Sequence, residues 1–237
     1  MARIPPSPAV RAATRQGLSV AIATGLYGVS FGALSVAAGI GVLPTMALSL
    51  LLFSGGSQFA LVGVVGAGGS PVAAVATAAL LGARNTLYGA VVTPLLGVRG
   101  PRRALAAQLT IDESTAVAAA QADRRAARAG FWVTGVGVFA LWNAFTLLGA
   151  LAGHAMGDPR AWGLDAAAAA AFLALVWPRL ASRATQVVAG VAVLVSVALI
   201  PVAPSGIPVL AAAASAIVVG WVAGPRATAP ASERAGA

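Results

Sequence analysis

The stretch Ala79-Leu80-Leu81-Gly82-Ala83-Arg84-Asn85-Thr86-Leu87-Tyr88-Gly89 places an arginine and an asparagine in the middle of the apolar run 71–97. The hydrocarbon on either side of Arg84 is long enough to lie inside a lipid bilayer. A guanidinium at that depth costs about 2.5–3.5 kcal/mol on insertion scales, and it is retained where it faces protein, water or a substrate. The interpretation of the remaining chain therefore depends on what Arg84 and Asn85 face.

The composition is that of a membrane protein. Of the 237 residues, 59% are hydrophobic and 9% are charged, and the mean hydropathy is +0.90. Soluble globular proteins carry about 25% charged residues. We therefore expect an all-α, polytopic integral membrane protein. Because the chain has no cysteine and one histidine, His154, we expect no disulfide, no metal site and no cofactor.

The positive charge also fits a membrane protein. All 15 basic residues are arginines, and the formal net charge is +9. In a soluble protein this charge would suggest a nucleic-acid partner, but no basic stripe with interleaved aromatic residues is present. The arginines instead cluster at the ends of apolar runs, as the positive-inside rule describes. We therefore expect a lipid bilayer as the surroundings and no nucleic acid as a partner.

About eight apolar runs of membrane length follow one another. Together they predict a single transmembrane domain over 17–224, between a cytoplasmic N-terminal tail at 1–16 and a disordered C-terminal tail at 225–237. The runs occupy residues 17–38, 44–67, 71–97, 104–122, 130–153, 161–178, 186–203 and 206–223.

The arginines predict the topology of these runs. The cluster Arg124–Arg128 marks a cytoplasmic loop, and the arginines of residues 1–16 place the N-terminus in the cytoplasm. The chain must then cross an even number of times before Arg124. Two arrangements satisfy this condition, and they differ in how the run 104–122 is used.

In the first arrangement the run 104–122 crosses the membrane, which gives about eight segments. This arrangement leaves the cluster Arg99–Arg103 outside, against the positive-inside rule. In the second arrangement 71–97 is re-entrant and 98–128 is cytoplasmic, which gives about seven segments. We favour the first because Gly32-Ala33-Leu34 and Gly149-Ala150-Leu151 echo each other late in two helices. That echo predicts an internal repeat whose two copies run parallel.

Glycine pairs with polar residues predict broken helices. The second run contains Phe53-Ser54-Gly55-Gly56-Ser57-Gln58 at its centre, and the third contains Gly82 beside Arg84. Where a membrane helix opens, its backbone amides and carbonyls become available to a ligand, provided that they line a cavity. Gln58 adds an amide that can donate and accept; its alternative role is a hydrogen bond between helices.

The order of these motifs resembles the AzlC family, the large subunit of two-component branched-chain amino acid exporters of bacterial cytoplasmic membranes. The resemblance covers residues 17–223. It is carried by Phe31-Gly32, then Phe53-x-Gly55-x-x-Gln58, Arg84 with Leu87-Tyr88-Gly89 and Pro94, Asp112-Glu113-Ser114, Trp142 with Thr146 and Gly149, and Gly163-Leu164-Asp165 with Phe172-Leu173-Ala174-Leu175.

The resemblance implies export of valine, leucine, isoleucine and sometimes methionine, with a small hydrophobic AzlD-like membrane subunit as partner. The family shows Asn-x-Arg-His before Leu-Tyr-Gly. This chain has Gly82 at the asparagine position and Asn85 at the histidine position, while Arg84 matches. Coupling or substrate choice is therefore the property in which this chain is expected to differ from its relatives.

A zwitterionic amino acid needs donors for its carboxylate, an acceptor for its ammonium and an apolar pocket. Arg84, with Asn85 beside it, supplies bidentate donors, and the opened backbone at Gly55 and Gly56, with Gln58, supplies amides or carbonyls. Carboxylates pair with the ammonium or carry a coupling proton, and aromatic rings flank the side chain. The expected carboxylates are Asp112, Glu113 and Asp165, and the expected rings are Phe53, Phe59 and Tyr88.

Each of these assignments has an alternative. Arg84 can form a structural ion pair with Asp112 or Glu113, and Asp165 can be a helix N-terminal charge. We expect a transporter, driven by proton motive force because no nucleotide motif is present, and not an enzyme. The two alternatives are a membrane scaffold subunit and a serine hydrolase that uses Ser57 with His154.

Overall fold

The computed structural model describes residues 7–156, 163, 173 and 176–223. Every regular element among these residues is a helix, as the sequence predicts. The chain divides into two compact units, residues 1–172 and 173–237, which are described separately. Most of the predicted run 161–178, which includes Asp165, and the predicted tail 225–237 lie outside the described residues.

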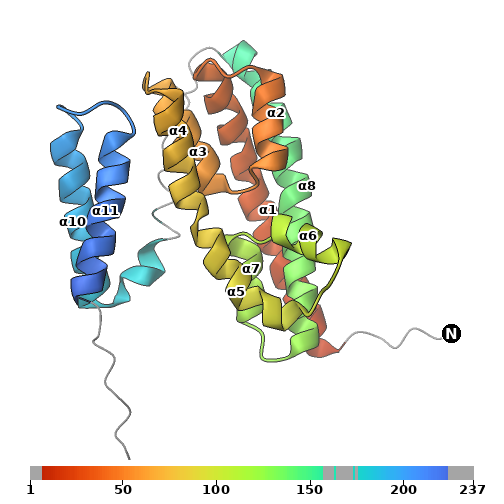
Figure 1. Ribbon diagram of the computed structural model, residues 1–237. Coiled ribbons are helices and arrows are strands. Elements are labelled where there is room, and N and C mark those ends of the chain that lie inside the picture. Colours follow the sequence, from red (N-terminus) through yellow and green to blue (C-terminus); the bar gives the residue numbers. More distant parts are fainter. Residues whose placement is uncertain (1–6, 157–162, 164–172, 174–175, 224–237) are drawn as a thin grey trace, which may run out of the picture. The chain divides into compact units, whose positions relative to one another are not determined.

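The first unit is built on two long helices, α1 (Pro8–Ala37) and α8 (Arg124–Met156), which lie side by side (Figure 1). Helix α1 begins well before the predicted Gly17, because Ser7 caps it through the backbone N–H of Val10 and Pro8 occupies its first turn. Both helices contain segments that are long and apolar enough to cross a membrane.

Glycines allow α1 and α8 to approach closely. A β-carbon added at Gly28 would lie 2.6 Å from the carbonyl oxygen of Trp142, and one added at Gly32 would lie 2.6 Å from the backbone nitrogen of Ala150. Helices that pack in lipid use such small residues at their contacts. The glycine spacing of the first run therefore correctly predicts a helix contact surface.

The contacts between α1 and α8 keep one order along both helices. Gly17 faces Thr134, Gly25 faces Leu141, and Gly32 faces Ala150. The two helices are therefore parallel and begin at the same end. The two Gly-Ala-Leu copies therefore lie on parallel helices, as a parallel internal repeat requires. The repeat itself stays a prediction.

Helices α2 (Val42–Leu51) and α3 (Gly55–Gly66) form a hairpin, not the single span predicted over 44–67. The chain reverses at Leu52–Ser54, and α3 returns to the end of α1, where a β-carbon at Gly66 would lie 3.2 Å from that of Ala38. The break expected at Gly55–Gly56 therefore lies slightly earlier in the chain, at Leu52–Ser54. The glycines begin α3, because Ser54 before them is extended (φ −153°, ψ 99°).

Helices α4 (Pro71–Gly82) and α5 (Arg84–Leu96) make one passage that is interrupted at Ala83. The helix is interrupted next to Gly82, as predicted, but it is not opened there, because Ala83 keeps right-handed helical dihedrals (φ −56°, ψ −30°). Ser70 caps the start of α4, and Gly97 ends α5 with a φ of +60°, a left-handed conformation that glycine adopts without strain.

Helices α6 (Pro101–Gln108) and α7 (Asp112–Ala119) form a second hairpin, so the single helix predicted over 104–122 is wrong. The Ser114 hydroxyl stabilises the reversal by accepting from Ile111 N (3.1 Å) and donating to Leu109 O (2.6 Å). A β-carbon at Gly135 of α8 would lie 3.0 Å from Leu109 Cβ. The tip therefore reaches well along α8.

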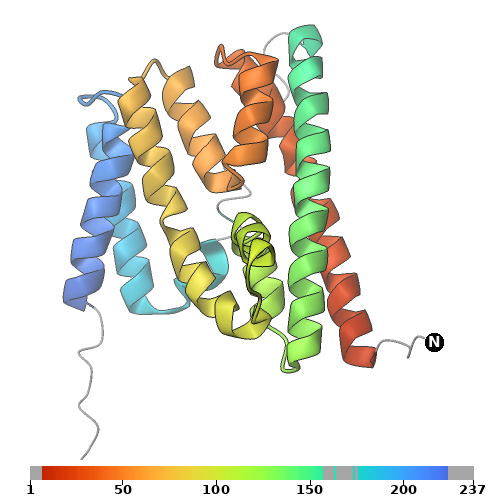
Figure 2. The same ribbon diagram turned by 45° about the vertical axis from the view of Figure 1, so that its right-hand side comes forward.

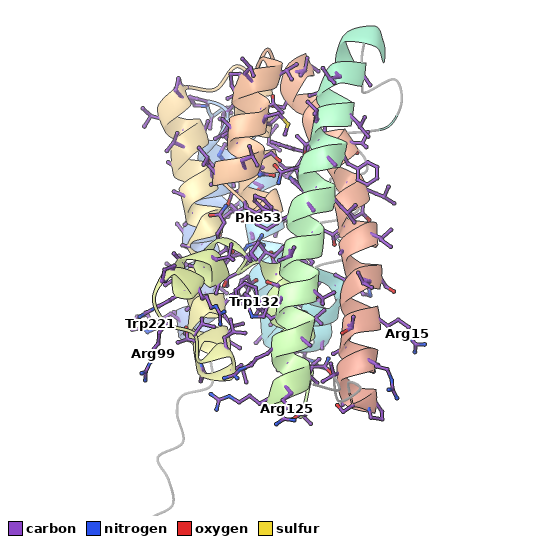
Figure 3. All side chains as sticks on the ribbon, turned by 90° about the vertical axis from the view of Figure 1, so that its right-hand side faces the viewer. Arg15, Phe53, Arg99, Arg125, Trp132 and Trp221 are labelled. Carbon is purple, nitrogen blue, oxygen red and sulfur yellow. The ribbon has the colours of Figure 1, made fainter. Side chains whose placement is uncertain are left out.

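The described part of the first unit thus contains three end-to-end passages, α1, α4–α5 and α8, and two hairpins that enter from opposite ends (Figure 2). Neither predicted arrangement anticipated this topology. It places Arg15, Arg99 and Arg125 at one end of the unit (Figure 3). The violation of the positive-inside rule that the arrangement of about eight segments implied is thereby removed.

The second unit contains a short 3-10 helix, η2 (Trp177–Ala181), and the paired helices α10 (Arg183–Leu199) and α11 (Ile207–Ala223). These two helices correspond closely to the predicted runs 186–203 and 206–223. Helix α10 begins slightly earlier than predicted because Ser182 and Thr185 form a capping box at its start.

Replacing Gly32 with alanine tests the contact between α1 and α8. The added methyl group has no room beside Ala150 N, so we expect Gly32→Ala to destabilise the fold by about 1–3 kcal/mol, measured by thermal unfolding of the purified protein in detergent. Gly63→Ala is the matched control, because a β-carbon there meets nothing within 4 Å. Equal melting temperatures of the two variants would contradict the assigned contact.

Candidate functional site

Three helix interruptions meet in the middle of the first unit. Gln108, at the end of α6, donates to the carbonyl of Leu50 at the end of α2 (2.8 Å). The two hairpin tips are therefore in direct contact. The break between α4 and α5 lies next to the hairpin α2–α3, since a β-carbon at Gly82 would lie 3.3 Å from Ser57 Oγ of α3.

An ion pair crosses this meeting point. Arg84 Nη2 lies 2.7 Å from Asp112 Oδ2, and the Tyr88 hydroxyl donates to Asp112 Oδ1. Arg84 and Tyr88 are one helical turn apart on α5, so they present their polar groups on the same face. Both oxygens of Asp112 are thus engaged by α5.

The pair offsets much of the cost of placing charges here. The side chains of Arg84 and Asp112 are 27% and 9% exposed. Asp112 is the first residue of α7, where the helix dipole favours a carboxylate. Of the two roles considered for Arg84, the structure shows the ion pair, and substrate binding stays a prediction.

Gln58 caps the broken end of α2. Its side chain is fully buried, and its Nε2 donates to Leu52 O (2.9 Å) and Leu48 O (3.1 Å). These carbonyls also accept from the backbone N–H groups of Leu52 and Ser54, so Gln58 adds a second, side-chain donor at the end of the helix. Gln58 therefore positions the hairpin, while its Oε1 is buried and has no hydrogen-bond partner among the described residues.

The N-terminus of α3 provides a second polar feature. Ser54 makes no side-chain cap there, so the first amides, including those of Gly55 and Gly56, have no acceptor within the helix. The partial positive charge of a helix N-terminus favours an anionic group. The indole of Trp142 covers this position, because a β-carbon at Gly55 would lie 3.3 Å from Trp142 Cη2.

Aromatic rings form an apolar wall beside Gly55. Phe31, Phe59 and Trp142 lie with their ring centroids 5.8–6.1 Å apart. Phe53, by contrast, packs edge-to-face on Phe139 at 5.0 Å and is 7% exposed. Trp142 and Phe31 were not predicted as site residues, although both occur in the family motifs, because an aromatic ring in an apolar helix usually serves packing alone.

Several polar atoms on the elements of this region are buried and have no hydrogen-bond partner among the described residues. Buried polar groups without partners are rare, so such atoms indicate where a ligand or water binds. They include Gln58 Oε1, Arg84 Nε, Asn85 Oδ1, Thr115 Oγ1, Trp142 Nε1 and Asn143 Oδ1.

The other predicted residues are distributed as follows. Glu113 is half-buried on α7 directly after Asp112, and it takes no part in the Arg84 ion pair. The hydroxyl of Ser57 donates to Ser54 Oγ (3.3 Å), which is not a general base. Within the described residues, no group of three or more His, Cys, Asp or Glu could hold a metal ion.

These features define an all-helical protein in which opposed hairpins hold an ion pair between long apolar helices. The chain belongs to the AzlC family: the family described as AzlC protein matches residues 19–156. The match begins within α1, runs to the last residue of α8 and includes both hairpins.

A curated relative covers more of the chain. The chain is 30% identical over 195 residues to an uncharacterized membrane protein of Archaeoglobus fulgidus, which is 81% of this chain and 85% of that protein. No solved structure matches the chain.

Gln58→Leu tests the capping role of Gln58. The substitution keeps an apolar volume but removes the side-chain hydrogen bonds to the carbonyls of Leu48 and Leu52, and each such bond contributes about 0.5–1.5 kcal/mol. We expect a clear loss of thermal stability in detergent. Gln121→Leu is the control, because Gln121 bonds to Gln16 near the exposed start of α1, where water replaces the lost contact. A fall in melting temperature of the same size in both variants would contradict the assignment.

Proposed function

We propose that this chain is the large subunit of a permease that exports branched-chain, hydrophobic amino acids across the bacterial cytoplasmic membrane. Membership of the AzlC family supports this function, and the archaeal relative is named a membrane protein. The long apolar helices α1 and α8 support a multi-pass arrangement. In this proposal the first unit, with its three passages and two re-entrant hairpins, belongs to a bundle of about seven or eight membrane segments.

The arginine-rich end faces the cytoplasm in this proposal. Arg11 and Arg15 lie at the start of α1, and Arg124, Arg125 and Arg128 lie at the start of α8. Positive charge is retained on the cytoplasmic side of membrane proteins. The N-terminus is then cytoplasmic, hairpin α6–α7 enters from the cytoplasm, and hairpin α2–α3 enters from outside.

The ion pair between Arg84 and Asp112 is the observation that carries the proposal. A zwitterionic amino acid carries one positive and one negative charge, so each of its charges has an opposite partner in this pair. Its carboxylate replaces Asp112 on Arg84 through a bidentate contact, and its ammonium takes the carboxylate of Asp112. One buried ion pair is exchanged for two, so no charge is left unpaired during binding.

The surroundings of the pair fit an aliphatic side chain. The rings of Phe31, Phe59 and Trp142 supply an apolar surface next to Gly55. The free amides at the start of α3 provide further donors for a carboxylate. A branched, uncharged side chain gains by leaving water against such a surface, whereas a polar one would lose hydrogen bonds.

Glu113 is our candidate for proton coupling. It is half-buried beside Asp112 and is not used by the ion pair. Binding or release of a proton on Glu113 changes the net charge of the site while the Arg84 pair is kept. Asp165 is a second candidate for this role.

A small AzlD-like membrane subunit is the proposed partner. Helix α1 exposes Leu18, Ile22 and Leu26 by 51–56%. These residues lie four positions apart, so they form one apolar stripe on the helix. Such a stripe suits contact with lipid or with a very hydrophobic partner helix.

Efflux from whole cells tests the proposed transport. Cells that express this chain with its small partner are loaded with labelled leucine or a leucine-containing peptide, and intracellular leucine is followed over time. We expect faster loss of leucine than in cells that carry neither protein. Equal intracellular leucine in the two strains would overturn the proposal and favour a scaffold role.

The exchange of ion pairs makes a sharper prediction. Arg84→Ala and Asp112→Asn should each reduce leucine efflux about tenfold or more, because each removes one charge-assisted contact to the substrate. Arg125→Ala, at the exposed arginine-rich end, is the control and should keep its activity. Leucinamide and 4-methylpentanoate, which each lack one charge, should not compete with leucine. Competition by either compound equal to that of leucine would contradict the exchange.

A further inference from the structure

A pocket lies at the arginine-rich end of the first unit. It has a volume of about 780 Å³ and is formed by the end of α5, the connection to α6, the start of α6 and the first turns of α8. Three arginines line it, namely Arg99, Arg102 and Arg128, and the lining contains no carboxylate. The pocket is therefore strongly positive, and it does not include the Arg84–Asp112 pair.

Arg128 is held in place at the wall of this pocket. Its Nε donates to Leu95 O at the end of α5 (3.2 Å), and a β-carbon at Gly97 would lie 2.9 Å from its Nη2. This contact uses one of the three guanidinium nitrogens. The two terminal nitrogens remain for a ligand, in the fixed fork that suits phosphate oxygens.

Arg99 and Arg102 are positioned differently. Both side chains are exposed, and within the part of the chain that the structure describes neither forms an ion pair. Their mutual repulsion and that of Arg128 favour the entry of an anion. Charge complementarity therefore identifies the ligand as an anion with several acceptor oxygens.

The rest of the lining is apolar. Leu96 is buried, Leu105 is 51% exposed, and Trp132 is half-buried. In Figure 3, Trp132 lies closer to the middle of the unit than Arg99 and Arg125, which lie near its end. Tryptophan at this depth is typical of the membrane interface. A ligand that fills the pocket thus has a phosphate-like head and hydrocarbon next to it.

The geometry points to a binding site for the phosphate headgroup of an anionic phospholipid, with its glycerol and first acyl carbons against Leu105 and Trp132. Basic pockets on the cytoplasmic side of membrane helices suit such lipids. The inference rests on the membrane location proposed above and does not depend on transport.

The pocket is connected to the central site through two helices. Helix α5 carries Arg84 at its start and reaches the pocket at its end, and α6 carries Arg102 at its start and Gln108 at its tip. A lipid bound here holds both helices at their cytoplasmic ends. It therefore stabilises the hairpin whose tip contacts α2.

Thermal unfolding with added lipids tests the site. The full chain is purified in a non-ionic detergent. It is then titrated with phosphatidylglycerol or with phosphatidylcholine of the same acyl chains. A ligand that binds the folded state raises the melting temperature in proportion to its affinity. We expect a saturable rise with phosphatidylglycerol and a clearly smaller one with phosphatidylcholine.

Variants then locate the effect. Arg99→Gln/Arg102→Gln should bind phosphatidylglycerol about tenfold or more weakly, because two charge-assisted contacts are lost. These residues are exposed, so the double variant should fold normally, and its melting temperature without lipid checks this. Arg103→Gln/Arg125→Gln is the matched control, because it removes the same charge at the same end from residues outside the pocket lining.

Three results would overturn the site. They are an equal shift with both lipids, an unchanged phosphatidylglycerol shift in Arg99→Gln/Arg102→Gln, and an equal loss in the control variant. Inorganic phosphate that reproduces the shift would also overturn it, because the pocket would then take a soluble anion. Leucine efflux is measured separately, so a failure of the lipid site is distinguishable from a failure of transport.

Discussion

The capping of broken helix ends is the constraint on which the rest of this structure depends. A helix that stops inside an apolar environment leaves carbonyls and amides without water to bind them. Here carbonyls at the end of α2 accept from backbone N–H groups and from the side-chain amides of Gln58 and Gln108, and Ser114 bonds to the backbone of the α6–α7 reversal. Because Gln58 and Gln108 come from different hairpins, satisfying the backbone also fixes the two tips against each other.

This arrangement determines where charge can be placed. The meeting point of the tips is the region in which free helix ends, and hence partial charges, are concentrated. Asp112 lies at such an end, and Arg84 begins α5 beside the break at Ala83. The pair links the passage α4–α5 to the hairpin α6–α7. In the exchange proposed above, a substrate that takes one partner of the pair would loosen this link and release the hairpin.

The sequence predicted some of these features because they are local. Glycine spacing in α1 predicted close helix contact, Gly82 predicted a break, and Asp112 was one of two partners considered for Arg84. The hairpins were missed because an apolar run of membrane length reads the same whether it crosses once or reverses at its centre. The difference lies in contacts remote in sequence, such as Gln108 to Leu50. Trp142 was missed for the same reason, since only the fold brings it to Gly55.

Asn85 constrains where a coupling proton can be held. The resemblance described for the sequence implies a histidine at this position, which would titrate near neutral pH, whereas an asparagine amide does not titrate. The Oδ1 of Asn85 is buried without a partner among the described residues, so it can accept a hydrogen bond from a bound ammonium but cannot store a proton. Asp112 is engaged by Arg84 and Tyr88. In the transport cycle proposed above, the carboxylate on α7 that remains for proton coupling is therefore that of Glu113.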